Sequence, residues 1–201
     1  MDTVIHKKLS SPLILASASP RRKLLLEQAG YSFDIAVPDI DEAAHLSDSI
    51  SAIAYTKLLA FEKAQAVAHK HPAALVIGAD TIVYADGKII GKADDHDHAR
   101  EIIELLFSRP HEVITGVALI KLDEHIRIVE SVTTIVYPKK LTPAQIDQHI
   151  QKGDWQGKAG AYGIQETGDE FVERIDGSLT NVMGFPMELV NDLLKQFVVK
   201  N

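Results

Sequence analysis

The sequence contains no cysteine among its 201 residues. This absence excludes disulfide bonds, thiolate metal sites and a cysteine nucleophile. Aromatic residues are also scarce, at 6% with a single tryptophan, whereas 46% of the residues are hydrophobic. We therefore expect a mostly aliphatic core of the kind that is ordinary in soluble globular proteins.

Long hydrophobic runs are missing as well, because no apolar stretch approaches the length needed to span a bilayer. Residues 1–11 are polar and lack the apolar core of a signal peptide. Excess positive charge is also absent: 28 acidic and 21 basic residues give a net charge of −7. These absences predict a cytoplasmic protein with neither nucleic acid nor a membrane as partner. A small anionic ligand is still allowed, because local charge decides its binding.

The chain shows no repeat, low-complexity tract or linker, which predicts one domain over residues 12–201 after an N-terminal extension, residues 1–11. Strand-like and helix-like segments alternate, and the runs 113–122 and 127–137 flank an Asp123-Glu124 turn as an antiparallel pair. We therefore expect an α/β fold with a mixed sheet flanked by helices. The other expected strands are 13–16, 33–36, 75–77, 82–84 and 171–175; the helices begin at Pro20, cover 51–70, run from Asp94 or Asp95 to Leu106, begin at Thr142-Pro143 and cover 186–197.

The most informative segment follows the first expected strand, where Ser17 and Ser19 precede Pro20 and three cationic residues, 21–23. Proline suits the first position of a helix, whereas cations are disfavoured there by the helix dipole. The unpaired N–H groups of a first helical turn favour an anion, and a polyphosphate is the natural ligand. The alternative is that Arg21, Arg22 and Lys23 simply form a solvated helix face.

Asp80 lies where an apolar strand passes through Gly78-Ala79, and an acid there is costly unless it is paired, metal-bound or functional. A structural aspartate satisfied by backbone amides is the alternative. Thr81 follows it, and only its neighbourhood makes its hydroxyl interesting.

Asp39, Asp41 and Glu42 lie in an expected loop, either as solvated surface or as ligands of magnesium, which takes one or two carboxylates. Lys63 and Lys92 are either surface lysines or phosphate contacts.

Two other segments contain chemistry-bearing residues. Residues 94–98 (Asp-Asp-His-Asp-His) are better explained as the acidic start of a helix than as a metal site, because their histidines are two residues apart. Residues 157–165 are glycine-rich but lack the spacing of a P-loop. There Gln165 could present its amide to the edge of a uracil or thymine base. A glycine-rich loop also spans 177–186.

Together these segments resemble the Maf family of nucleoside triphosphate pyrophosphatases, in the family's order and from about residue 12 to 195. The matching segments are 16–22, 41–42, 62–64, 78–81, 91–92, 115–117, 158–165 and 177–186.

The resemblance implies an elongated mixed sheet flanked by helices, with two lobes and a central cleft, similar to the inosine triphosphatases. It implies hydrolysis of a nucleoside triphosphate to the monophosphate and pyrophosphate with a divalent metal (magnesium or manganese), and Asp80 matches the proton acceptor. Arg21, Thr81 and Gln165 match the specificity positions of the subgroup that acts on dTTP and UTP. The family name further implies a link to septum formation and division arrest.

From these inferences we derive one hypothesis. Arg21, Lys63 and Lys92 hold the triphosphate, and Arg22 either helps or is structural. Ser17 and Ser19 donate to phosphate. Asp80 and Glu42 hold the metal, and a water attacks the α-phosphorus.

The alternatives are a non-catalytic nucleotide-binding regulator of septum formation and the same chemistry on 7-methyl-GTP. The sequence leaves open whether the protein is a monomer or a homodimer.

Overall fold

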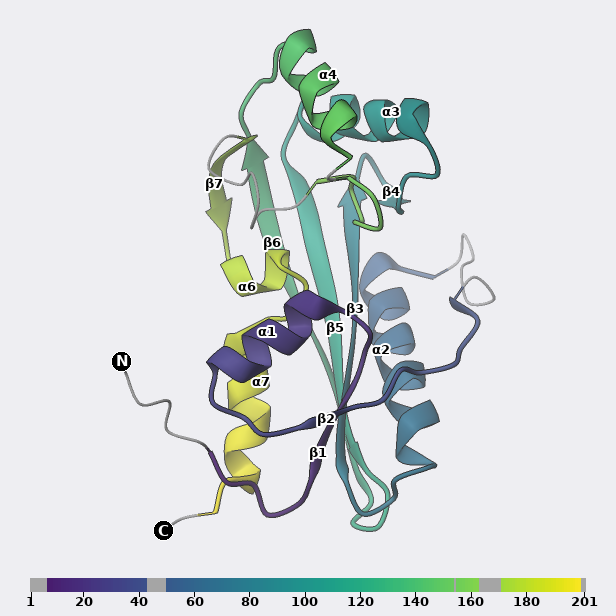
Figure 1. The fold of residues 1–201 in the computed structure, drawn as a ribbon, viewed down its shortest axis with the longest axis vertical. Coiled ribbons are helices and arrows are strands. Elements are labelled where there is room, and N and C mark those ends of the chain that lie inside the picture. The colour runs from purple at the N-terminus through teal and green to yellow at the C-terminus, as the bar shows by residue number, and fades with distance from the viewer. Residues whose placement is uncertain (1–6, 43–49, 154, 163–170, 200–201) are drawn as a thin grey trace. The chain divides into compact units, whose positions relative to one another are not determined.

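Strands and helices alternate along the chain in a computed structural model that describes residues 7–42, 50–153, 155–162 and 171–199 (Figure 1). The strands are β1 (Leu13–Ala16), β2 (Asp34–Ile35), β3 (Leu75–Ala85), β4 (Lys88–Ile90), β5 (His111–Lys121), β6 (Ile126–Pro138) and β7 (Val172–Asp176). The helices are α1 (Pro20–Gln28), α2 (Ala52–Ala68), α3 (His96–Leu106), α4 (Pro143–Lys152), α6 (Leu179–Val182) and α7 (Met187–Leu194), and α7 is followed by the 3-10 turn η2 (Lys195–Phe197).

The strands hydrogen-bond in the order β2-β1-β3-β5-β6-β7, and β4 pairs with β3 beside this path. β1 is parallel to both β2 and β3, whereas β4 is antiparallel to β3 and β7 is antiparallel to β6. The seven-stranded sheet is therefore mixed, and the α/β fold expected from the sequence is confirmed. The expected cleft between two lobes stays a prediction.

The chain divides into two compact units, which we describe separately. Unit 1 comprises residues Met1–Asp80, Thr115–Val132 and Gly184–Asn201, and unit 2 comprises Thr81–Ile114 and Thr133–Met183.

The core of unit 1 contains small residues where α2 meets the strands, and Figure 1 shows α2 running alongside β3. A Cβ atom added to Gly78 in β3 would lie 2.7 Å from the backbone oxygen of Ala60. At Gly116 in β5 the same addition would lie 2.3 Å from the backbone oxygen of Thr56. Only glycine allows such a close backbone approach. The two glycines thus let α2 pack closely against the sheet. Its side chains can therefore reach Asp80, the last residue of β3 that belongs to unit 1.

Unit 2 has a larger aromatic share in its core, which includes Phe107, Trp155, Tyr162 and Phe171 among aliphatic residues of α3, α4 and the strands. Its β3–β4 hairpin turns at Asp86 and Gly87, whose φ angles of 53° and 75° are typical of the tight turn that an Asp-Gly pair favours. An Asp-Gly pair between two strand-like runs is a hairpin signal in the sequence, and the structure confirms the hairpin here.

Helix starts in unit 2 follow the expected capping. Asp95 accepts a hydrogen bond from the backbone of His98 at 2.8 Å and so begins α3. Thr142 and Gln145 form a reciprocal capping box at the start of α4. The acidic run before α3 therefore caps a helix, in agreement with the non-metal interpretation.

Several details differ from the sequence-based expectation. Helix α6 (Leu179–Val182) occupies part of the expected loop 177–186. Residues 78–80 do not interrupt β3, which is one strand of 11 residues. Gly78, the glycine that suggested a break, instead allows α2 to pack closely against the strand. Helical periodicity over 51–70 places Ile53 on one face with Ala60, Ala64 and Val67, but Ile53 is 47% exposed. The last helix ends as α7 at Leu194, and η2 replaces its expected final turn.

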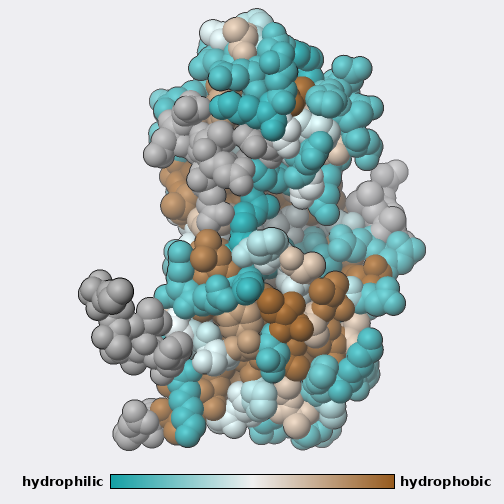
Figure 2. All heavy atoms as spheres, viewed as in Figure 1, coloured by the Kyte–Doolittle hydropathy of each residue, from teal (hydrophilic) through white to brown (hydrophobic). Residues whose placement is uncertain are grey.

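The surface of unit 1 carries exposed hydrophobic residues at Ile35 in β2 and at Val37, which are 46% and 64% exposed. Figure 2 shows hydrophobic surface near this segment. In the described part of the chain, no helix combines the length and apolarity required to cross a membrane.

Candidate active site

Helix α1 begins at Pro20, as the sequence predicts, and the structure adds a capping residue before it. Ser19 is the N-cap residue of α1, its hydroxyl accepting from the backbone N–H of Arg22 at 3.5 Å, and proline occupies the first turn. Ser17, which is 6% exposed, follows the buried strand β1 and accepts a hydrogen bond from the backbone N–H of Ser19 at 3.2 Å. Both serines predicted to bind phosphate therefore lie in one ordered turn at a helix N-terminus.

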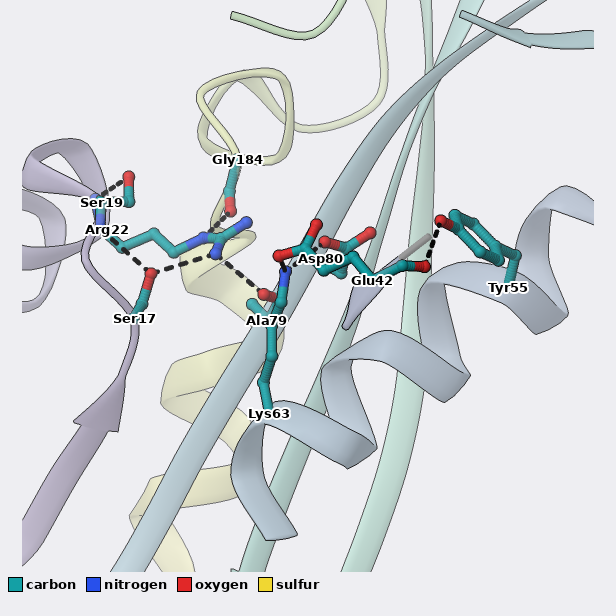
Figure 3. Close-up of polar contacts among 9 residues, drawn as sticks. All are labelled: Ser17, Ser19, Arg22, Glu42, Tyr55, Lys63, Ala79, Asp80 and Gly184. Atoms are coloured by element: carbon teal, nitrogen blue, oxygen red, sulfur yellow. Dashed lines mark hydrogen bonds and ion pairs between the residues drawn. The ribbon is translucent and has the colours of Figure 1, made fainter. Parts of the chain in front are cut away.

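Arg22 points into unit 1, as Figure 3 shows, and its guanidinium joins three segments of the chain. Its Nε donates to the backbone oxygen of Gly184 at 2.9 Å, and its Nη1 donates to the backbone oxygen of Ala79 at 2.8 Å and to Ser17 Oγ at 3.2 Å. Burial lowers the pKa of the Arg22 guanidinium, and the negative charge of Asp80 opposes that shift. The structure thus gives Arg22 protein partners where the sequence suggested a phosphate, which favours the structural alternative.

The other two cations of this helix start have different surroundings. Lys23 is exposed and lies 3.8 Å from Glu27, one turn further along α1, as on a solvated helix face. Arg21 is half-buried and forms no hydrogen bond or ion pair with another residue of the described ranges. Of the three, Arg21 is therefore the candidate for an anionic ligand.

Three charged side chains meet where β3 leaves unit 1, namely those of Lys63, Asp80 and Glu42 (Figure 3). Lys63 reaches from α2 and places its Nζ 2.6 Å from Asp80 Oδ1 and 2.8 Å from Glu42 Oε1. Lys63 and Asp80 are 8% and 6% exposed, while Glu42 is exposed. Two buried charges are stable only when they are paired, and here they pair with each other. Asp80 is therefore not the aspartate satisfied by backbone amides that the sequence allowed.

Tyr55 is a member of this cluster that the sequence did not reveal. It lies two helical turns before Lys63 on α2, and its hydroxyl donates to the backbone oxygen of Glu42 at 3.4 Å. Burial raises the pKa of the Tyr55 phenol, and the charges of Asp80 and Glu42 raise it further. A buried tyrosine of this kind has no sequence motif; its helical spacing from Lys63 is the only signal, and that spacing is also ordinary for a core residue.

The two carboxylates provide a test of the expected metal. In the described ranges no group of three or more acidic or histidine side chains forms a metal site. Asp80 and Glu42 nevertheless each place a carboxylate oxygen close to Lys63 Nζ, so both carboxylates face the same positive charge. One or two carboxylates, completed by water and substrate phosphates, are the donor set that magnesium or manganese takes in nucleotide sites. These residues fit such a cation.

The contacts predicted for the other site residues are not tested by the geometry of this cluster. Thr81 and Lys92 belong to unit 2, where Thr81 is half-buried in β3 and Lys92 is exposed, its backbone forming a bridge with Ala159. Gln165 lies outside the described residues. Asp41 is exposed beside Glu42. Their predicted contacts with substrate stay predictions.

Comparison with known proteins agrees with the family expected from the sequence. The family model described as Maf-like protein matches residues 12–197, so this chain belongs to the Maf family.

Several curated relatives are named dTTP/UTP pyrophosphatase. The relative from Symbiobacterium thermophilum is 42% identical over 92% of this chain and 93% of its own length. Those from Vibrio vulnificus and Clostridioides difficile are each 41% identical over 92% of this chain, and cover 98% and 94% of their own lengths. Among solved structures, a HAM1 protein from Coxiella burnetii matches 65% of this chain and 74% of its own with a TM-score of 0.43 and 15% identity.

Proposed function

We propose that this protein hydrolyses dTTP and UTP to the nucleoside monophosphate and pyrophosphate. The observation that carries the proposal is the convergence of Lys63, Asp80 and Glu42 in unit 1. Three curated relatives are 41% or 42% identical to this chain over 92% of its length. Their name, dTTP/UTP pyrophosphatase, supports the same substrates.

In this reaction a water attacks the α-phosphorus, a new P–O bond forms, and the bond from the α-phosphorus to the bridging oxygen breaks. Asp80 accepts the proton of the attacking water, and pyrophosphate leaves. Arg21 neutralises phosphate charge, and Ser17 and Ser19 donate hydrogen bonds to phosphate oxygens. Lys63 keeps the carboxylates of Asp80 and Glu42 together. Positioning and charge neutralisation supply most of the rate in phosphoryl transfer, so these roles are sufficient in kind.

Asp80 and Glu42 would hold the divalent cation, as magnesium or manganese. When bound, it supplies positive charge that polarises the phosphate oxygens. Arg21, Thr81 and Gln165 select the pyrimidine base in this proposal, as the family resemblance implies.

The proposal is tested by measuring pyrophosphate release from the purified protein with dTTP, UTP, CTP, GTP and 7-methyl-GTP, with magnesium and with manganese. We expect turnover of dTTP and UTP, and its loss in Asp80→Asn. Turnover confined to 7-methyl-GTP would keep the chemistry and reject the pyrimidine specificity. Tight nucleotide binding without any turnover would replace the enzyme with a nucleotide-binding regulator.

A further inference from the structure

Ser17 has an unusual hydrogen-bonding state for a buried hydroxyl. Its Oγ accepts from two donors, the backbone N–H of Ser19 and Nη1 of Arg22, both at 3.2 Å. A serine hydroxyl has two lone pairs and one proton, so both of its acceptor positions are filled. Within the described ranges Ser17 donates to no acceptor, although it is 6% exposed. Its O–H proton is therefore directed away from both donors and is available to an acceptor outside this network.

The chemistry of that outside group follows from this polarity. A cation or a second donor has no lone pair to meet on Ser17 Oγ, whereas an anionic oxygen accepts the remaining proton. The turn that carries Ser17 also begins α1, whose N-terminus favours an anion. Both features favour an anionic oxygen, and in the proposed function that oxygen belongs to a phosphate.

Arg22 enforces this state of Ser17 and at the same time fixes the strand before Asp80. The two N–H groups of its Nη1 are used by Ser17 Oγ and the backbone oxygen of Ala79, and its Nε is used by Gly184 (Figure 3). A guanidinium makes such contacts in one plane and with fixed angles. The Ser17 hydroxyl and the strand that carries Asp80 are thereby held at set positions relative to one planar group.

We propose that Arg22 is a positioning residue of this site, which directs the Ser17 hydroxyl as a donor toward a phosphate oxygen and fixes the backbone that carries Asp80. The inference rests on the proposed function for its substrate, and it assigns Arg22 a role different from that of a direct phosphate ligand. Lysine separates the two roles: it is a good point-charge phosphate binder, but it lacks the planar fork.

The test measures kcat and KM for dTTP in Arg22→Lys, Arg22→Gln, Ser17→Ala and the double variant Ser17→Ala/Arg22→Lys, with folding checked by thermal unfolding. We expect both Arg22 variants to lose kcat by about 100-fold, because misplacement by about an ångström has that effect. Ser17→Ala alone should lower kcat/KM about tenfold, the loss for one hydrogen bond to a charged acceptor. In the Arg22→Lys background the same change should cost less than about threefold, because the two residues act as a unit.

Lys23→Gln is the matched control, because Lys23 lies next to Arg22 in α1 but is exposed and paired with Glu27. It should leave both constants unchanged. Retention of wild-type kcat by Arg22→Lys with only a raised KM would overturn the proposal in favour of a direct phosphate contact. Independent, multiplying losses for Ser17→Ala and Arg22→Lys would overturn it as well.

A binding measurement covers the case in which the Arg22 variants fail to fold. Calorimetry with pyrophosphate and magnesium should show about tenfold weaker binding for Ser17→Ala than for the wild type. Equal affinities, or no binding by the wild type, would overturn the inference. Because this measurement needs no turnover, failure of the proposed function, seen as a wild type that binds pyrophosphate but releases none from any nucleotide, is distinguishable from failure of the Arg22 role.

Discussion

One buried polar pair in each unit shows a clear contrast. In unit 1, the ammonium of Lys63 and the carboxylate of Asp80 are buried as charges 2.6 Å apart. In unit 2, His111 and Tyr162 are buried as a ring and a phenol, with Nε2 of His111 2.6 Å from the Tyr162 hydroxyl. Burial lowers the pKa of His111 and raises the pKa of Tyr162, so both groups are neutral at pH 7.

This difference separates function from stability. A buried ion pair is a weak source of stability, because desolvation offsets its Coulomb energy. A neutral buried hydrogen bond has a smaller desolvation cost and a modest net benefit. The Lys63–Asp80 pair is therefore better explained by chemistry, and the His111–Tyr162 pair by packing.

The largest effect expected is that of Asp80→Asn on turnover. Loss of a proton acceptor lowers kcat by about 100- to 10,000-fold, and the neutral amide cannot take the proton. The measurement is pyrophosphate release from dTTP. Near-normal turnover by a folded Asp80→Asn protein would show that Asp80 is not the base.

Lys63→Met tests the energetic side of the comparison. It leaves the Asp80 carboxylate buried without its ammonium, and we expect a loss of about 3 kcal/mol in the free energy of unfolding. Lys57→Met is the control on the same helix, because Lys57 is half-exposed and lies 3.8 Å from the exposed Glu130. Surface pairs of that kind contribute about 0–1 kcal/mol. Equal losses in urea unfolding of the two variants would contradict the distinction.

His111→Phe probes unit 2 in the same assays. It keeps an aromatic ring but leaves the Tyr162 hydroxyl and the backbone oxygen of Leu106 without His111, their hydrogen-bond partner at 2.6 and 3.1 Å. The expected loss of unfolding free energy is about 1–3 kcal/mol. At a temperature where the variant is folded, kcat/KM for dTTP should equal that of the wild type.

The smallest expected effect is a pH dependence of stability. Because burial lowers the pKa of His111, the unfolded chain binds its proton more readily than the folded chain does. The wild type should therefore lose stability as pH falls below the ordinary histidine pKa of 6.5. The stability difference between wild type and His111→Phe should shrink from pH 7.5 to 5.5. A difference that grows over this range would have the wrong sign.

Local features of the fold could be predicted from the sequence. Residues such as Pro20, Asp95 and Thr142 mark helix starts that the structure confirms. The buried stripe of α3, with Ala99 and Leu106 among its members, follows from helical periodicity alone. These features depend on residues within a few positions of one another.

The site could be predicted only in its residue types. Lys63 and Asp80 were both candidates, but their pairing depends on Gly78, which lets α2 approach β3. Arg22 bonds residues 57 and 162 positions away along the chain, and no local pattern encodes such contacts. The cationic helix start therefore suggested a turn that binds an anion, whereas the fold turns Arg22 toward protein groups and leaves Lys23 on the surface.

One experiment tests most directly whether the Lys63–Asp80 pair serves the reaction and the His111–Tyr162 pair serves stability. It measures pyrophosphate release from dTTP by wild type, Asp80→Asn and His111→Phe in parallel, each below its unfolding temperature. We expect wild type and His111→Phe to react at the same rate and Asp80→Asn to release pyrophosphate about 100- to 10,000-fold more slowly. Activity retained by Asp80→Asn, or lost equally in His111→Phe, would contradict the assignment of the chemistry to the ion-paired cluster of unit 1.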